Sequence, residues 1–384
     1  MTVNYLDNNA TTCAAPEVLA EIQPYFCELY GNPSSMHAFG GQIGAKVREA
    51  RQRVAQLLGC QPGEIVFTGC GTESNNTAIH GTLAAHPERR KIITTRVEHP
   101  AVLAVCRELE NHGYTVVELA VDRQGRLEID ELKSELDDDT ALVSVMYANN
   151  ETGVIFPVEE IAELVTSRGI VFHTDAVQAV GKIPLDLSTS KIDLLSLSGH
   201  KLHAPKGVGV LFIRKGTRLA PFMLGGHQER GRRAGTENVP GIIGLGRACE
   251  LAQESFDLEN NQVKQLRDKL EQALLQGCEG ALLNGDPDHR LPNTTNVSFE
   301  YVEGEAILLM LNQFGICASS GSACTSGSLE PSHVLRAMGV PFTAAHGSIR
   351  FSLSRYTTEK EVDLVVEKLP AVIKRLRELS PFVH

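Results

Sequence analysis

Short β-branched segments alternate with helical patterns between residues 64 and 213, and this alternation constrains the fold more than any other feature. The candidate strands are EIVFT (64–68), KIITT (91–95), ALVSVMY (141–147), GIVFHTD (169–175), IDLLSLS (192–198) and GVGVLFI (207–213). Two of the intervening segments, AVLAVCRELENHG and PVEEIAELVTSRG, are apolar on one helical face and end on glycine. This order predicts an α/β domain with a mostly parallel sheet covered by helices.

The remaining sequence predicts a second, smaller domain. Residues 239–277 have the pattern of one long, mostly amphipathic helix, which we expect to bridge the two domains. A polar loop, a strand, the helix EGEAILLMLNQFG, the strand SIRFSLS and a terminal helix follow it. We therefore expect a large α/β domain over residues 14–255. The small α+β domain would combine residues 1–13 and 256–384.

Composition and charge narrow the class of function. The chain has 384 residues, and its 47 acidic and 36 basic residues give a net charge of −11. This balance argues against general binding of nucleic acid or anionic membranes and favours small-molecule chemistry. No apolar stretch reaches the roughly 18 residues of a membrane span, and the N-terminal sequence lacks the pattern of a signal peptide. We expect a cytoplasmic protein without a membrane segment.

One of the nine cysteines stands in an unusual context. The cysteines include no CxxC pair and are odd in number, so neither a disulfide framework nor a zinc site is expected. Cys324 lies within SSGSACTSGS, where small and hydroxyl-bearing neighbours cannot fill a core. Such a segment predicts an exposed loop, and an exposed thiol is open to oxidation. Its presence therefore indicates that the thiol is used.

Polar residues follow the ends of most predicted strands, where open parallel sheets bind their ligands. GCGTESNN after the first strand contains Gly71 and Thr72 and predicts a phosphate-binding turn of backbone N–H groups at the start of a helix. The residues that follow the other strands are His99, Asn149, Asn150, Asp175, Gln178, Ser198, His200 and Lys201. Each of these is a weak signal alone, because a histidine is usually structural and an aspartate often caps a helix. Together they match the needs of pyridoxal phosphate.

The chemistry of that cofactor assigns a role to each residue type. Lys201 would form the imine with the aldehyde, because a partly buried amine beside positive charge loses its proton readily. Asp175 would face the pyridine nitrogen, since a protonated ring is the electron sink. His99 would stack on the ring, and Asn150 and Gln178 would contact the phenolic oxygen.

Two local alternatives involve the same segment, SLSGHKLHAPKGVG. Lys206 also lies near a strand end and is a rival for the imine, but Lys201 directly follows the Ser198–His200 turn and is preferred. His200 and His203 are three residues apart, a usable spacing for a metal, but no neighbouring thiol or carboxylate completes a ligand set.

With these residues assembled, the chain resembles the cysteine desulfurases, enzymes of the class V aminotransferase group with the aspartate aminotransferase-like fold (PLP-dependent transferase fold type I). The resemblance runs nearly from end to end. It rests on segments that include YLDNNATT, GTESNN, VEHPAV, YANNETG, HTDAVQAVGK, SLSGHKLHAPKGVG, GGHQERGRRAGTEN, SSGSACTSGSLEPSH and IRFSLSRYTT.

The resemblance implies a full set of site residues. Lys201 would bond to the cofactor, Asp175 would pair with the pyridine nitrogen, and His99 would stack on the ring. The phosphate ligands would be Gly71, Thr72, Ser198 and His200, with Thr236 reaching in from the second subunit of a homodimer. Asn150 and Arg350 would bind the substrate, Arg350 by clamping the carboxylate of L-cysteine.

The resemblance also explains Cys324. This thiol would attack the sulfur of the bound cysteine, carry it as a persulfide, and leave L-alanine. The long form of the Cys324 segment is similar to the group that passes sulfur directly to iron–sulfur scaffold proteins. GGHQERGRRAGTEN and GEAILLMLN are most similar to the nitrogen-fixation (NifS) branch, so nitrogenase maturation is the expected role. Transient ligation of an iron–sulfur cluster by Cys324 is a further expectation.

Two rival functions stay open at this point. A selenocysteine lyase or a plain aminotransferase on the same scaffold would need no protein thiol. A non-catalytic protein that holds pyridoxal phosphate and docks iron–sulfur assembly proteins would make no alanine from cysteine.

Overall fold

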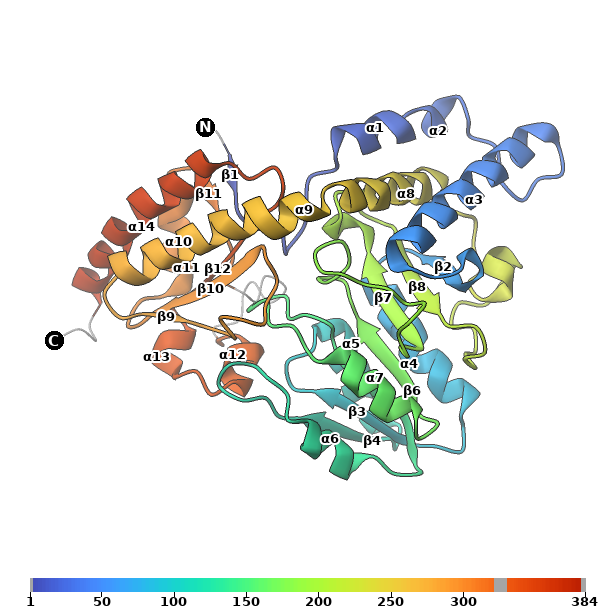
Figure 1. The fold of residues 1–384 in the computed structure, drawn as a ribbon, viewed down its shortest axis with the longest axis horizontal. Helices are drawn as coiled ribbons and strands as arrows, with labels where there is room; N and C mark the ends of the chain where they lie inside the picture. Colours follow the sequence, from blue (N-terminus) through green and yellow to red (C-terminus); the bar gives the residue numbers. More distant parts are fainter. Residues whose placement is uncertain (1–2, 321–329, 381–384) are drawn as a thin grey trace.

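The computed structural model describes residues 3–320 and 330–380, and a sheet of seven strands is at its centre (Figure 1). The strand order is β2 (Ile65–Thr68), β8 (Gly209–Ile213), β7 (Leu194–Ser198), β6 (Val171–Asp175), β5 (Thr140–Ser144), β3 (Lys91–Thr95) and β4 (Thr115–Leu119). The pairs from β7 to β4 are all parallel, whereas β8 is antiparallel to both its neighbours. The predicted α/β fold with a mostly parallel sheet is confirmed.

The edge strand β4 was not among the predicted strands. In its sequence, TVVEL, only Leu119 is fully buried, whereas the central strands are buried along nearly their whole length.

Helices cover both faces of this sheet. Ile92 of β3 packs with α4 (Gly71–Ala85) and α5 (Pro100–Asn111), whereas the next residue, Ile93, belongs to the core on the opposite face. That second face carries α3 (Ala38–Leu58), α7 (Val158–Thr166) and α8 (Val239–Glu254). Because successive side chains of a strand point to opposite faces, the continuous apolar strands supply both cores at once.

Short elements complete this part of the chain. They are α1 (Pro16–Ile22), α2 (Pro24–Cys27), η1 (Pro62–Glu64), α6 (Ile129–Glu135), η2 (Gly199–Lys201) and η3 (Gln228–Gly231).

The C-terminal part of the chain forms a second sheet, which lies beside the first (Figure 1). Its strands are β12 (Ser348–Ser352), β10 (Thr294–Phe299) and β9 (Ala281–Leu283), all antiparallel, and β1 (Asn4–Tyr5) pairs with β11 (Ile316–Cys317) nearby. The helices α10 (Lys264–Gly277), α11 (Gly304–Asn312) and α14 (Glu359–Leu379) share its core with Leu6. The short helices α12 (His333–Ala337) and α13 (Phe342–Ala345) instead add side chains to the large core. The predicted domain boundaries stay a prediction.

The expected single helix over residues 239–277 is wrong in detail. Helix α8 ends at Glu254, and a short turn of helix, α9 (Phe256–Leu258), follows. A π-helical segment, η4 (Glu259–Val263), then leads into α10. The sequence carries no signal of this break. The backbone leaves the helical conformation at Ser255, where neither glycine nor proline is present.

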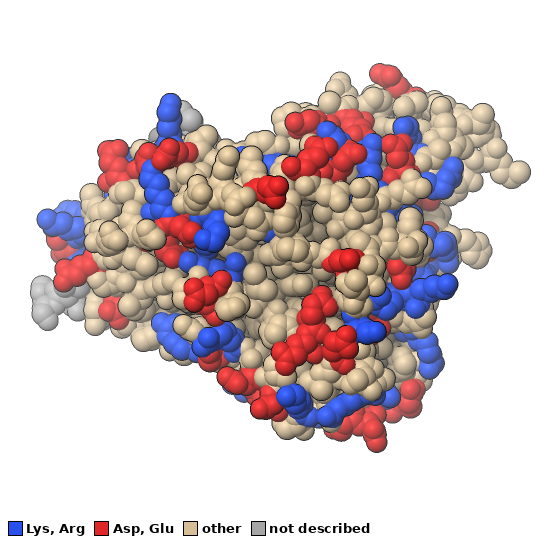
Figure 2. All heavy atoms as spheres, viewed as in Figure 1, with Lys and Arg blue, Asp and Glu red and all other residues tan. Residues whose placement is uncertain are grey.

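The charged side chains on the viewed surface are of mixed sign (Figure 2). Some residues of opposite charge are neighbours within one helix: Lys133 Nζ lies 2.8 Å from Asp130, and Lys264 Nζ lies 2.7 Å from Asp268. Within the described ranges, the structure contains no helix with both the length and the apolar character needed to cross a bilayer.

Candidate active site

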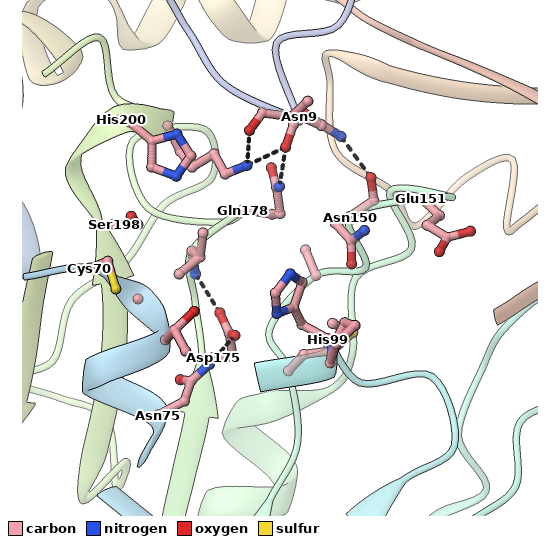
Figure 3. A pocket seen from close by; sticks show the side chains of 18 of the residues that line it. Asn9, Cys70, Asn75, His99, Asn150, Glu151, Asp175, Gln178, Ser198 and His200 are labelled. Atoms are coloured by element: carbon pink, nitrogen blue, oxygen red, sulfur yellow. Dashed lines mark hydrogen bonds between the residues drawn. The ribbon is translucent and has the colours of Figure 1, made fainter. Parts of the chain in front are cut away.

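One cavity of about 400 Å³ lies where the predicted strand ends meet. Its lining includes side chains that follow β2, β3, β5, β6 and β7, together with the N-terminal segment around Asn9 (Figure 3). The predicted residues that line it are Gly71, Thr72, His99, Asn150, Asp175, Gln178, Ser198, His200, Lys201 and Arg350. The structure therefore brings together ten of the predicted positions from separate parts of the chain.

The start of α4 forms one wall. Cys70 is the residue before the helix, so the N–H groups of the first turn are available to a ligand at this end. Gly71 must lack a side chain here, because a Cβ atom would lie 2.8 Å from Val177 Cγ2. A small anion such as a phosphate group fits this wall.

Asp175 at the end of β6 is a buried carboxylate held by neutral donors. Asn75 Nδ2 donates to its Oδ2 at 2.6 Å, and the Val177 N–H donates to its Oδ1 at 3.0 Å. Asn75 lies four residues after Gly71, on the same face of α4. A carboxylate in this setting can accept a further hydrogen bond from a protonated ring nitrogen.

Lys201 contributes an amine to the cavity. It belongs to the short η2 turn after β7, and its Nζ donates to the carbonyl oxygens of Asn9 and Ala10, the latter at 2.7 Å. Gln178 Nε2 donates to the same Asn9 oxygen at 3.0 Å (Figure 3). The N-terminal segment thus places two carbonyl groups around the amine.

His99 is neutral in this environment. It caps α5, where its Nδ1 accepts the Ala101 N–H at 3.1 Å, so the neutral ring holds its proton on Nε2. Burial is the largest influence and lowers the pKa of His99, with Lys201 and His333 acting in the same direction and Asp175 opposing them. A neutral imidazole in this tautomer can stack on a flat ligand and donate a hydrogen bond from Nε2–H.

His200 and Arg350 are also anchored by neighbours. His200 Nδ1 contacts Thr11 Oγ1 at 3.0 Å, and burial is the first cause that lowers the pKa of His200 to about 4. Arg350 on β12 is almost fully buried; its Nη1 donates to the Asn150 carbonyl at 2.9 Å and its Nη2 pairs with Asp7 at 2.6 Å. Within residues 3–320 and 330–380 its Nε is buried without a hydrogen-bond partner.

Two of the residues considered in the sequence lie outside this cavity. Thr236 lines a different cavity, whose lining also includes Glu229 and Arg233. Lys206, the rival for the imine, is exposed, and the cavity lining does not include it. Cys324 lies outside the described residues.

The lining residues that the sequence did not predict include four with amide, carboxyl or imidazole side chains: Asn9, Asn75, Glu151 and His333. Burial is the main cause that raises the pKa of Glu151, and the Ser332 hydroxyl donates to its carboxylate. Asn75 and Glu151 each stand beside a predicted residue, within GTESNN and YANNETG, so proximity in sequence was the available signal. Asn9 and His333 lie within the segments YLDNNATT and SSGSACTSGSLEPSH, but neither stands beside a predicted cavity residue, and only the tertiary fold brings these two residues to the sheet.

Comparisons with known proteins agree along almost the whole chain. The family model described as aminotransferase class-V matches residues 4–365. A cysteine desulfurase of Trichormus azollae is 63% identical over 382 residues, which is 100% of this chain and 96% of the relative. The cysteine desulfurase NifS of Azotobacter vinelandii is 60% identical over 379 residues, 98% of this chain and 94% of the relative. A solved NifS-like protein superposes with a TM-score of 0.92 at 41% identity, covering 98% of this chain and 100% of the other.

Proposed function

The chain belongs to the aminotransferase class-V family, as its sequence predicts, and we propose that it is a cysteine desulfurase that converts L-cysteine to L-alanine and protein-bound sulfur. The observation that carries this proposal is the convergence of Lys201, Asp175 and His99 on one cavity at the strand ends. The full-length similarity to relatives named cysteine desulfurase supports it.

The residues of the cavity fit pyridoxal phosphate. The first turn of α4, which begins at Gly71, offers N–H groups to a phosphate, and Asp175 offers a buried carboxylate bound only by amide N–H donors among the described residues. Lys201 supplies the amine, and Ser198, His200 and Thr72 add polar groups near the phosphate wall. When bound, the cofactor supplies an electron sink for the bonds at the substrate α-carbon.

Arg350 is suited to hold the substrate carboxylate. Its guanidinium is fixed by Asp7 and the Asn150 carbonyl, and its buried Nε is a donor that finds no acceptor among the described residues. An unpaired buried donor is costly, so a bound carboxylate would relieve that cost. This placement orients L-cysteine with its α-amino group and thiol toward the rest of the cavity.

His99 would move a proton during the reaction. Its Nδ1 is occupied by the Ala101 N–H, so Nε2 is the atom that holds or releases the proton. Because burial keeps this imidazole neutral near pH 7, its Nε2–H can donate a hydrogen bond to the substrate, and the ring takes up a proton only when the Ala101 N–H leaves Nδ1.

Cys324 would take the sulfur. Its thiolate attacks the substrate sulfur, an S–S bond forms as the C–S bond breaks, and the bond electrons stay with the carbon, which gains a proton to give alanine. The product on the protein is a persulfide, ready for transfer to an acceptor thiol.

The remaining expectations belong to the same proposal. The protein would act as a cytoplasmic homodimer in which Thr236 of one subunit reaches the phosphate of the other. The position of Thr236 outside its own chain's cavity supports that arrangement. An iron–sulfur scaffold protein would accept the sulfur for nitrogenase maturation, and Cys324 would transiently ligate a cluster. The two domains would divide at residues 14 and 256.

A single assay tests the activity. Purified protein with pyridoxal phosphate and L-cysteine should release equal amounts of alanine and sulfide when a reductant is present. Mass spectrometry without reductant should find one extra sulfur on the peptide that contains Cys324. Cys324→Ser should abolish both; unchanged output from this variant would favour a lyase or aminotransferase that needs no thiol. Absence of alanine from a cofactor-loaded protein would favour the docking role.

A further inference from the structure

Lys182 is a buried amine that the proposed reaction does not use. It lies in HTDAVQAVGK, four residues after Gln178, and is 8% exposed. Burial is the main cause that lowers its pKa to about 8; Arg350 adds to this effect and Glu259 opposes it. Lysine is rarely buried unless it has a partner, so its position calls for a specific role.

The contacts of Lys182 lead directly to the active site. Its Nζ donates to Gln178 Oε1 at 3.1 Å, and Gln178 Nε2 donates to the Asn9 carbonyl at 3.0 Å. Lys201 Nζ donates to that same carbonyl. A continuous set of hydrogen bonds therefore joins the buried amine to the amine of the cavity.

These contacts fix the orientation of the Gln178 amide from both ends. An ammonium group only donates, so the amide oxygen must face Lys182. A carbonyl only accepts, so the amide nitrogen must face Asn9. Because the nitrogen has two hydrogens, one remains for an acceptor in the cavity, whose lining includes Gln178.

The surroundings of Lys182 hold it in place. A small cavity of about 20 Å³ lies behind the active site, and its lining includes Lys182, Lys201 and Glu259. Asn260, from the π-helical segment η4, donates to the Lys182 carbonyl at 3.0 Å. Single π-helical turns in long helices often mark functional sites. Here the turn brings Glu259 and Asn260 against the segment that carries Lys182.

We propose that Lys182 is a positioning residue that locks the Gln178 amide so that its free N–H hydrogen points at the cofactor's phenolic oxygen. This inference deepens the proposed function and rests on it. Without the lysine, only the Asn9 carbonyl holds the amide, so a turned amide that presents its oxygen, which would repel an oxygen acceptor, becomes more populated.

A purely structural role makes a different prediction. If Lys182 only joins η4 to the large core, its removal should lower stability but leave the cofactor's environment unchanged. Lys91 provides a matched control because it is a lysine of similar burial, 9% exposed, at the other end of the sheet. It pairs with Glu135 and Asp137, at 3.3 and 3.0 Å.

The test compares Lys182→Met and Lys91→Met in the full-length protein reconstituted with pyridoxal phosphate. We expect Lys182→Met to weaken cofactor binding about tenfold, the loss typical of one charge-assisted hydrogen bond, and to raise the pH midpoint of the cofactor's absorbance change. Lys91→Met should leave both quantities at the wild-type values even if its melting temperature falls. Gln178→Ala should reproduce both changes, and adding Lys182→Met to it should cause no further change.

Each outcome decides the matter. Equal effects of Lys182→Met and Lys91→Met, or additive effects of Lys182→Met and Gln178→Ala, would overturn the positioning role while the proposed function stands. If Lys182→Met does not fold, the test rests on Gln178→Ala. Wild-type cofactor affinity and pH midpoint in that variant would overturn the positioning role, and changes in both would support it. A wild-type protein that binds no pyridoxal phosphate would overturn both proposals.

Discussion

Acid should destabilise this protein through His173, a histidine enclosed in the middle of the sheet. His173 on β6 is fully buried, with its two ring nitrogens 2.8 Å from Ser144 Oγ and 2.9 Å from Ser196 Oγ on the neighbouring strands. Burial lowers its pKa from 6.5 to about 3. The native ring therefore stays neutral at pH 5, whereas the ring in the unfolded chain takes up a proton.

The sign and size of the effect follow from this difference. A base with a lowered native pKa leaves stability intact above the unfolded pKa of 6.5, lowers it as the pH falls, and has no further effect below about pH 3. Each pH unit in that window costs about 1.4 kcal/mol, so acidification to pH 5 should cost about 2 kcal/mol from this one side chain.

Urea unfolding at several pH values can isolate that contribution. The difference in unfolding free energy between wild type and His173→Gln should be constant above pH 7 and should shift by about 2 kcal/mol in favour of the variant at pH 5. His112→Gln is the control for the substitution itself, because the His112 side chain is 64% exposed. A pH-independent difference for His173→Gln would refute the reasoning, since it would mean that the native ring is protonated or already open to water.

Three further outcomes test other parts of the structure. Arg350→Lys should raise the KM for L-cysteine at least tenfold in steady-state assays, because an ammonium cannot make the bidentate contact with a carboxylate; an unchanged KM would contradict that role. Glu229→Gln should cost about 3 kcal/mol in urea unfolding, because its side chain is only 4% exposed and pairs with Arg51 at 2.6 Å. A loss below 1 kcal/mol would show that the pair adds little. Gly71→Ala should weaken pyridoxal phosphate binding in a fluorescence titration, because the new Cβ would lie 2.8 Å from Val177 Cγ2; wild-type affinity would mean that α4 shifts without cost.

The fold class was predictable because its signal is local. Strands such as β6 (VFHTD) and β7 (LLSLS) are short segments rich in β-branched and other apolar residues, and polar residues mark their ends within two or three positions. Asp175 and Ser198 could therefore be placed at one edge of a sheet before any contact was known. The break after α8 was not predictable, because Ser255 changes the helix path without a local breaker.

Supporting residues were harder to find than the residues they support. Asn75 donates a hydrogen bond to Asp175, which lies 100 positions away in the chain. The Asn9 carbonyl accepts one from Lys201, 192 positions away. Short-range patterns carry no information on such pairs. These hydrogen-bonded pairs depend on how α4 and the N-terminal segment pack against the seven-stranded sheet.

By itself, the sequence determined the alternation of strands and helices, the residues at the strand ends and the family to which they belong. Only the tertiary structure decided which groups meet: the carbonyls around Lys201, the amide donors on Asp175 and the buried Lys182 behind Gln178. The physical reason is that secondary structure follows from the periodicity of neighbouring residues, whereas hydrogen bonding and burial within the cavity follow from the packing of segments far apart in the chain.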